Sequence, residues 1–310
     1  MASPYIVLVV SLVLILVCSQ LFVKLSSQLS TALRLSPLII GTTLVALGTS
    51  LPELAVSLTA AANQDFPLAV GNLIGSNITN LLFVFPIAIL AGRIKIGTTK
   101  TIRNTIIMLL VAAFFSLSLI THIPYPETGW LLLIGAVIFS TVEYLWGASG
   151  RRHEDAHRFS KTSQALPLTT ILPLFILSVI GIFFGGRFTV LSVENISLLT
   201  GLSTGFLGLT LTAVATSLPE LITTLTSQAL HQDKLTEGNI IGSNVYNLLF
   251  IGGVVLLVSP RSPIAPLPLY ILLACTLFFT ILLLNYSGRP LPKKIAWLML
   301  PAFLLYLLVI

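Results

Sequence analysis

Charged side chains are scarce in this chain of 310 residues, because Asp, Glu, Lys and Arg together make up only 8% of it. Apolar residues account for 55%, and uncharged runs long enough to cross a bilayer follow one another along the whole sequence. This composition excludes an ordinary water-soluble domain and predicts an all-α integral membrane protein.

Cysteine and histidine are also rare. The two cysteines, Cys18 and Cys275, both lie in apolar runs, so we expect free thiols and no disulfide. The histidines lie in or beside loops, at His122, His153, His157 and His231. The sequence therefore indicates neither a proton relay through imidazole nor a membrane base for an intramembrane serine protease. An enzyme is not expected, and neither is a bound cofactor.

The chain contains one stretch twice. Residues 41–84, GTTLVALGTSLPELAVSLTAAANQDFPLAVGNLIGSNITNLLFV, align without a gap with residues 208–251, GLTLTAVATSLPELITTLTSQALHQDKLTEGNIIGSNVYNLLFI, and roughly half of the pairs are identical. The offset is 167 residues (220 − 53). Each copy carries one carboxylate in an apolar setting, at Glu53 and Glu220. An ionised Glu in hydrocarbon costs about 2.5–3.5 kcal/mol on insertion scales, so we interpret the pair as a site rather than as two structural groups.

The apolar runs predict ten spans, arranged as two five-helix repeats at residues 1–146 and 166–310 around a hydrophilic linker at 147–165. We expect the first run to be a retained helix rather than an export signal, because no Lys or Arg precedes it. The ten spans are Tyr5–Val23, Pro37–Ala62, Leu68–Ala91, Thr105–Ile120, Gly129–Trp146, Leu166–Gly185, Gly201–Leu230, Leu235–Val258, Pro263–Asn285 and Lys294–Ile310.

The basic residues predict the orientation. With both termini outside, 14 of the 16 lie on the inner side, which is a strong positive-inside bias in a plasma or inner membrane. This arrangement puts the linker in the cytoplasm and explains the net charge of +6 without a nucleic-acid partner. The inner residues are Lys24, Arg34, Arg93, Lys95, Lys100, Arg103, Arg151, Arg152, Arg158, Lys161, Lys234, Arg289, Lys293 and Lys294, and the outer ones are Arg187 and Arg261.

Helix breaks are expected inside both copies. Pro52 removes a backbone donor near the centre of its span, and Gly71 and Gly75 are expected to interrupt the next one. Whether the glycines serve helix packing, the site or both is left open. Five spans per repeat make the second repeat enter from the opposite side, so the two acids should meet near the midplane of an inverted pair. Broken helices in matching positions are typical of a transporter's substrate site.

The polar side chains around the acids all offer oxygen. Two stripes accompany each acid: Thr49, Ser50 and Ser57 with Asn72, Ser76 and Asn80 in the first copy, and Thr216, Ser217 and Thr224 with Asn239, Ser243 and Asn247 in the second. Hard cations such as Ca²⁺ prefer oxygen ligands, whereas softer metals prefer nitrogen and sulfur. The site is therefore predicted to take Ca²⁺ or Na⁺.

These residues resemble a known family. GTSLPE with GNLIGSNITN, and ATSLPE with GNIIGSNVYN, are similar to the two α-repeats of the cation/calcium exchanger superfamily, in particular its prokaryotic sodium/calcium exchanger branch. The resemblance implies an antiporter that moves Na⁺ inward to extrude Ca²⁺ by alternating access. It also implies the ion ligands: Glu53, Glu220, Thr49, Ser50, Thr216, Ser217, Ser76, Ser243, Asn80 and Asn247, with backbone carbonyls of Ala46 and Ala213.

One departure from the family pattern carries a prediction. Relatives often have Asp where this chain has Asn247, so we expect no K⁺ requirement and weaker competition by protons. The region of Leu73 and Ile240 lacks the additional acid typical of proton/calcium exchangers, although a proton/calcium or other monovalent/divalent cation antiporter remains the alternative. A channel fits less well, because channels commonly form acid rings by oligomeric symmetry. We expect a functional monomer in a lipid bilayer.

The remaining acids receive simpler interpretations. Asp65, Asp233 and Glu237 are placed in short turns, where they could attract cations at the mouths of the site, and we interpret them as solvated charges. Glu143 and Glu194 are interpreted as interfacial or gate-related groups.

Overall fold

The computed structural model describes residues 3–32, 48–92, 94–97, 99–121, 123, 125–149, 167–229, 233–259 and 262–310. These residues are helical almost throughout, and within them the only strand-like pairing is an isolated bridge between Lys95 and Pro290. The predicted all-α class is confirmed.

The first half of the described chain contains α1 (Pro4–Ala32), α4 (Leu51–Ala62), α5 (Phe66–Thr79), η2 (Asn80–Val84), α6 (Phe85–Ala91), α7 (Thr99–Ile120) and α8 (Tyr125–Ser149). The second half contains α9 (Leu168–Thr200), α10 (Thr204–Leu207), η3 (Gly208–Thr212), α11 (Ala213–Thr216), α12 (Leu218–Ala229), α13 (Asp233–Tyr246), η4 (Asn247–Ile251), α14 (Gly252–Val258), α15 (Pro266–Asn285) and α16 (Lys294–Val309). The elements η2, η3 and η4 are single turns of π-helix.

Eight helical stretches of the described residues are long and apolar enough to cross a membrane. They are Pro4–Phe22, Phe66–Ala91, Thr99–Ile120, Tyr125–Leu145, Leu168–Thr200, Thr204–Thr226, Thr236–Val258 and Pro266–Asn285. Two shorter apolar helices, α4 and α16, accompany them. The protein is therefore a multi-pass helical bundle, and the count of ten spans stays a prediction.

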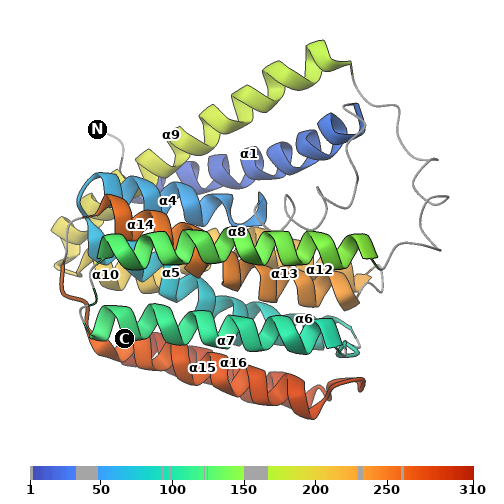
Figure 1. Ribbon diagram of the computed structural model, residues 1–310. Coiled ribbons are helices and arrows are strands. Elements are labelled where there is room, and N and C mark those ends of the chain that lie inside the picture. Colours follow the sequence, from blue (N-terminus) through green and yellow to red (C-terminus); the bar gives the residue numbers. More distant parts are fainter. Residues whose placement is uncertain are drawn as a thin grey trace.

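The helices form a bundle in which α5 and α13 lie in the interior. Figure 1 shows α1 and α9 side by side along one edge of the bundle and α15 with α16 along the opposite edge. Large buried side chains fill the space between them, for example Phe85 of α6, whose ring meets Phe279 of α15 edge to face at 4.8 Å. The stretches Phe66–Ala91 and Thr236–Val258 are the most buried of the eight, and they carry the polar stripes.

Both copies of the repeat have a helix break at the same position. Ser50 (φ −85°, ψ 9°) precedes α4, and Ser217 (φ −80°, ψ 3°) precedes α12. Pro52 and Pro219 then lie in the first turns of α4 and α12, where a missing N–H costs nothing because no carbonyl of the same helix awaits it. The predicted break is confirmed, and it places Glu53 and Glu220 in a first helical turn.

The predicted interruption at Gly71 and Gly75 is wrong. α5 runs through both glycines and changes to a π-helix only at Asn80, and α13 likewise becomes η4 only at Asn247. A glycine weakens a helix by about 1 kcal/mol, which the packing of a buried span readily overcomes. In both copies the irregular turn instead begins at the last asparagine of the motif.

The glycines of α5 serve close packing. A Cβ on Gly71 would lie 2.6 Å from the carbonyl oxygen of Gly205, and one on Gly75 would lie 2.6 Å from Cβ of Ala213. Gly208 of η3 faces back, since a Cβ there would lie 2.8 Å from Leu68 O. The first copy thus contacts the second almost backbone to backbone along α5 and η3.

The sixth predicted span, Leu166–Gly185, corresponds to α9, which is longer than predicted. α9 continues past Gly185 to Thr200, and its C-cap Gly201 takes the left-handed conformation (φ 72°) that ends many helices. Gly185 and Gly186 do not stop it because they are tight contacts: a Cβ on Gly186 would lie 2.8 Å from Ala55 O of α4. Arg187 and Glu194 therefore belong to the helix and not to a loop after it.

Two acids join α13 to the connection between α6 and α7. Asp233 Oδ2 accepts the Lys95 N–H at 3.1 Å, and Glu237 Oε1 accepts the Gly97 N–H at 2.8 Å. The Thr101 hydroxyl donates to Glu237 Oε2 at 2.6 Å, and Glu237 is only 3% exposed. The interpretation of Glu237 as a solvated turn charge is wrong, because α13 already begins at Asp233 and turns this side chain inward.

Asp65 and Glu143 also have structural partners. Asp65 caps the N-terminus of α5 through Leu68 N–H at 3.0 Å and accepts the Thr204 hydroxyl at 2.9 Å. Glu143 of α8 pairs with Lys100 at 2.9 Å and with Arg103, both from α7. These carboxylates tie neighbouring helices together at their ends.

We expect Gly71→Ala to destabilise the protein. The added Cβ would press on backbone atoms of Gly205 and Leu209, which cannot move aside as a side chain can, and such overpacking costs about 1–3 kcal/mol. Thermal unfolding of the purified protein in detergent measures the loss. Gly135→Ala on α8 is the control, because its Cβ would meet only methyl carbons of Leu249 at 3.0 and 3.9 Å. Equal unfolding temperatures for the two variants would contradict the backbone contact.

Candidate functional site

The two acids of the repeat lie in one buried site. Glu53 lies in the first turn of α4, Glu220 lies in the first turn of α12, and both are 0% exposed. The Ser217 hydroxyl donates to Glu53 Oε1 at 3.5 Å, and the Ser50 hydroxyl donates to Glu220 Oε1 at 3.3 Å. Each helix break thus presents its serine to the carboxylate of the other copy, and these contacts bring the two copies together at their acids. That the acids meet near the midplane of an inverted pair stays a prediction.

The threonines beside the serines also contact side chains of the opposite copy. Thr49 Oγ1 donates to Asn239 Oδ1 at 3.3 Å and lies 3.4 Å from Ser243 Oγ. Its counterpart, Thr216, makes the matching contacts in the opposite direction. Thr216 Oγ1 donates to Asn72 Oδ1 at 3.4 Å and lies 3.3 Å from Ser76 Oγ. Every one of these contacts recurs at an offset of 167 residues, so the two copies surround a common centre.

Two asparagines hold the acid-bearing helices in place. Asn72 Nδ2 donates to the carbonyl of Glu53 at 3.4 Å and to Ser57 Oγ at 3.0 Å. Asn239 Nδ2 donates to the carbonyl of Glu220 at 3.2 Å and to Thr224 Oγ1 at 3.1 Å. Asn72 therefore connects α5 to α4, and Asn239 connects α13 to α12, in each case at the residue that carries the acid. These hydrogen bonds orient the two carboxylates.

The last asparagines of the motifs differ between the copies. Asn80 Nδ2 donates to Asn244 Oδ1 at 3.1 Å, which fixes the plane of its amide. Asn247 is fully buried, and neither atom of its side-chain amide has a hydrogen-bond partner. Both residues begin a π-helical turn, a feature that often marks functional sites.

Several oxygens at this site are buried without a hydrogen-bond donor. They are Oε2 of Glu53, Oε2 of Glu220, Oδ1 of Asn80 and Oδ1 of Asn247. Leaving a buried acceptor unsatisfied costs about 1–3 kcal/mol, and more for a charged group. Two of these oxygens belong to the acids and two to Asn80 and Asn247, which begin η2 and η4, and these turns pack against α12 and α4, respectively. Oxygens of this kind are suited to bind a cation.

The backbone at the second break adds a carbonyl. Ala213 O accepts Ser217 N–H at 3.1 Å and lies 3.4 Å from Thr216 Oγ1, and Ala213 itself is buried. Its counterpart Ala46 lies outside the described residues, so the predicted role of its carbonyl is not tested by the structure.

The chemistry of the site is that of oxygen ligands. Among the described residues no group of three or more His, Cys, Asp or Glu side chains lies together, so two carboxylates supply all of its negative charge. Hydroxyl and amide oxygens supply the rest. Such a set suits hard cations and offers nothing to a metal that prefers thiolate or imidazole.

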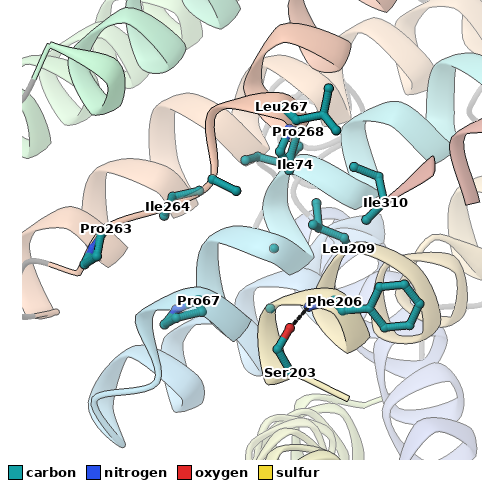
Figure 2. A pocket seen from close by; sticks show the side chains of 13 residues that line it. Pro67, Ile74, Ser203, Phe206, Leu209, Pro263, Ile264, Leu267, Pro268 and Ile310 are labelled. Atoms are coloured by element: carbon teal, nitrogen blue, oxygen red, sulfur yellow. Dashed lines mark hydrogen bonds between the residues drawn. The ribbon is translucent and has the colours of Figure 1, made fainter. Parts of the chain in front are cut away.

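A separate pocket lies at one end of α5 and does not include the acids. Figure 2 shows its residues coming from α5, from α10 with η3, from the segment before α15 and the first turn of α15, and from Ile310. Its volume is about 260 Å³, and its lining is apolar apart from Ser203, whose hydroxyl accepts the Phe206 N–H at 3.1 Å. An apolar lining does not hold a bare cation, so this pocket is not the ion site.

Sequence reasoning placed Asn72 and Asn239 in the polar stripes but did not assign them a role. Their importance lies in contacts to the opposite copy and to the backbone of the acids, which spacing along one helix does not reveal. Asn244 accepts the Asn80 side-chain N–H at 3.1 Å and so connects the two copies. Exact repetition of these asparagines in both copies was the available signal.

We expect the double change Glu53→Gln and Glu220→Gln to raise the unfolding temperature of the ion-free protein. Two buried acids with unsatisfied oxygens destabilise the fold, and amides carry no charge into the interior. A gain of 1 kcal/mol would raise the temperature by about 2–4 °C. Thermal scans in choline buffer with a chelator measure it. Glu143→Gln is the control and should lower the temperature, since it loses two ion pairs. A double variant no more stable than wild type would contradict this account.

Comparison with known proteins agrees with the geometry. The sequence profile of the family described as "Sodium/calcium exchanger protein" matches residues 3–142 and 170–310. The "Putative antiporter CaxA" of Alkalimonas amylolytica is 32% identical over 304 residues, which cover 96% of this chain and 95% of that protein. The "Inner membrane protein YrbG" of Escherichia coli is 30% identical over 290 residues, covering 91% and 89%. The "Sodium/calcium exchanger MaX1" of Methanosarcina acetivorans is 28% identical, covering 83% and 84%.

Solved structures of the sodium–calcium exchanger NCX_Mj share the fold. One, from a crystal soaked with Na⁺ and Sr²⁺, has a TM-score of 0.65 and 25% identity and covers 99% of this chain and 98% of that chain. Another, soaked with Na⁺ and without Ca²⁺, has a TM-score of 0.67 and 26% identity and covers 97% of each chain. Because the profile spans most of the sequence and the relatives cover nearly all of it, this chain belongs to the sodium/calcium exchanger family of membrane cation antiporters.

Proposed function

We propose that the protein exchanges Na⁺ for Ca²⁺ across the membrane by alternating access, with the ions held between Glu53 and Glu220. The observation that supports this most directly is the set of buried oxygens without donors on both acids and on Asn80 and Asn247. Oxygens that cost free energy when bare become favourable when a cation is bound among them. The alternation of bound and empty states is what a transporter requires.

The proposed ligands are those named from the sequence. Carboxylate oxygens come from Glu53 and Glu220, and side-chain oxygens from the neighbouring hydroxyls and amides. Backbone carbonyls come from Ala46 and Ala213. The hydroxyl and amide ligands are Thr49, Ser50, Thr216, Ser217, Ser76, Ser243, Asn80 and Asn247.

The charge of the site favours exchange over one-way transport. Two carboxylates neutralise one Ca²⁺, and Na⁺ ions can replace it at the same oxygens. An empty site would carry two unpaired charges through a medium of low dielectric, which is slow because the desolvation penalty is several kcal/mol per ion. Only loaded forms then cross readily, so movement of one cation requires movement of the other.

The proposed frame is ten spans in two inverted five-helix repeats, residues 1–146 and 166–310, with the linker 147–165 in the cytoplasm and both termini outside. The contacts that recur at an offset of 167 residues support this frame. α1 and α9 pack on each other through Ser11 and Thr189, whose hydroxyl oxygens lie 2.9 Å apart. We propose that this pair moves against a comparatively fixed core in the plasma or inner membrane, and that one monomer is sufficient.

A proton/calcium antiporter is the second candidate. Glu53 and Glu220 can bind protons as well as Na⁺, and one relative is named only as a putative antiporter. The sodium/calcium relative and the solved exchanger structures favour Na⁺. The coupling ion is therefore the quantity to measure.

We expect reconstituted protein to take up ⁴⁵Ca²⁺ when a Na⁺ gradient is imposed, and Glu53→Gln or Glu220→Gln to reduce uptake at least about 100-fold, since each removes half of the charge that holds the ion. Proteoliposomes with Na⁺ inside and choline outside give the measurement, and Glu127→Gln, at an exposed acid in the first turn of α8, is the control. Uptake that is driven by a pH gradient and does not depend on Na⁺ would show that the coupling ion is H⁺. Uptake without any counter-ion would indicate a channel instead.

We expect Asn247→Asp to make Ca²⁺ transport more sensitive to pH. Asn247 is a neutral amide with no hydrogen-bond partner, and Asp would add a third ionisable group beside the two acids. Protons would then compete with Ca²⁺, so uptake should fall more steeply as pH decreases in the variant than in wild type. Wild-type uptake should not require K⁺. Identical pH and K⁺ profiles for the two proteins would contradict the role given to residue 247.

A further inference from the structure

A groove of about 480 Å³ lies between α15 and α16. These helices form the edge of the bundle opposite α1 and α9 (Figure 1). Ala274 and Cys275 of α15 line the groove on one side, and Met299, Ala302 and Tyr306 of α16 line it on the other. The space exists because small side chains, Ala274 and Ala302, stand where larger ones would close it. Leu82 of η2 completes the inner wall.

The groove opens on the surface that faces the bilayer. Leu298 and Leu305 at its border are 63% and 60% exposed, and both helices are apolar along their length. A protein with these helices in a membrane presents such leucines to hydrocarbon. Water is not held by an apolar lining, and an empty groove would forfeit the dispersion contacts of its walls. In a bilayer, the molecules available to fill the groove are the acyl chains of lipids.

The dimensions of the groove fit one leaflet. Its lining extends along α16 from Leu298 to Val309 and along α15 from Leu267 to Phe278, twelve residues in each case. Twelve residues of helix are about 18 Å long, which is a little more than half of a hydrocarbon core of about 30 Å. The two helices run in opposite directions, so Leu267 and Val309 lie at the same end. In the proposed orientation this is the outer end.

We propose that this groove binds one acyl chain of a phospholipid. The chain would pack against the ring of Tyr306, which is 3% exposed and whose hydroxyl donates to the Leu209 carbonyl of η3 at 2.7 Å. It would also contact Leu82, two residues after Asn80. The bound lipid would therefore contact η2 directly and reach η3 only through Tyr306, although its binding does not depend on which ions are exchanged.

The test uses a phosphatidylcholine that carries a diazirine in the middle of one acyl chain, diluted into phosphatidylcholine vesicles that contain the full-length protein. After illumination, mass spectrometry locates the adducts. The exposed face of α8 around Val137, which is 66% exposed, serves as the reference for ordinary lipid contact. We expect about tenfold more adduct in the groove than on this face, corresponding to about 1.4 kcal/mol of preference.

Filling the groove should remove this preference. Ala302→Phe places a ring in the space, and Ala274→Leu fills it more mildly should the first variant fail to fold. Val137→Phe enlarges a lipid-facing side chain elsewhere and should leave the groove adducts unchanged. Equal adduct densities on the groove and on α8 in wild type, or a preference that survives both filling variants, would overturn the proposal.

Discussion

Two carboxylates buried at the centre of an apolar bundle are the constraint on which the rest of this structure depends. An ionised acid in such a medium needs donors or a cation, and the chain meets the first need only in part. Ser217 donates to Glu53 and Ser50 to Glu220, while the second oxygen of each acid has no donor. The proposed exchange relies on this incomplete satisfaction, because a site completed entirely by its own side chains would have no use for an ion.

The helix breaks supply the geometry for this arrangement. Proline costs little in the first turn of a helix and much more in its interior, which favours a new helix start at each LPE segment. The serine before each segment lies outside that helix and turns toward the opposite copy. Asn72 and Asn239 then attach the backbone of each acid to the neighbouring helix. Gly71 and Gly75 allow the α5 and η3 backbones to approach closely enough for these contacts to form. The helix breaks, the asparagine amides and the glycines act together, because each of them contributes to the contact between the two halves.

The polar residues outside the centre hold the periphery. Asp65 caps α5, Glu143 pairs with basic residues of α7, and Glu237 binds backbone and hydroxyl groups beside α7. On the bilayer side the Tyr306 hydroxyl satisfies a carbonyl of η3, which connects the last helix to the segment that leads into Thr216 and Ser217. Through this bond the outer surface of the bundle is linked to the segment that carries part of the proposed ion site.

The sequence by itself determined that this is a helical membrane protein with two copies of an acid-bearing motif, because composition and internal repetition are properties of the chain alone. It also located the break before each LPE segment, since the backbone of proline acts locally. It could not place the irregular turns at Asn80 and Asn247, extend α9 to Thr200, or turn Glu237 inward. Those outcomes depend on which helices pack together, and packing between distant segments overrides local preferences of about 1 kcal/mol per residue.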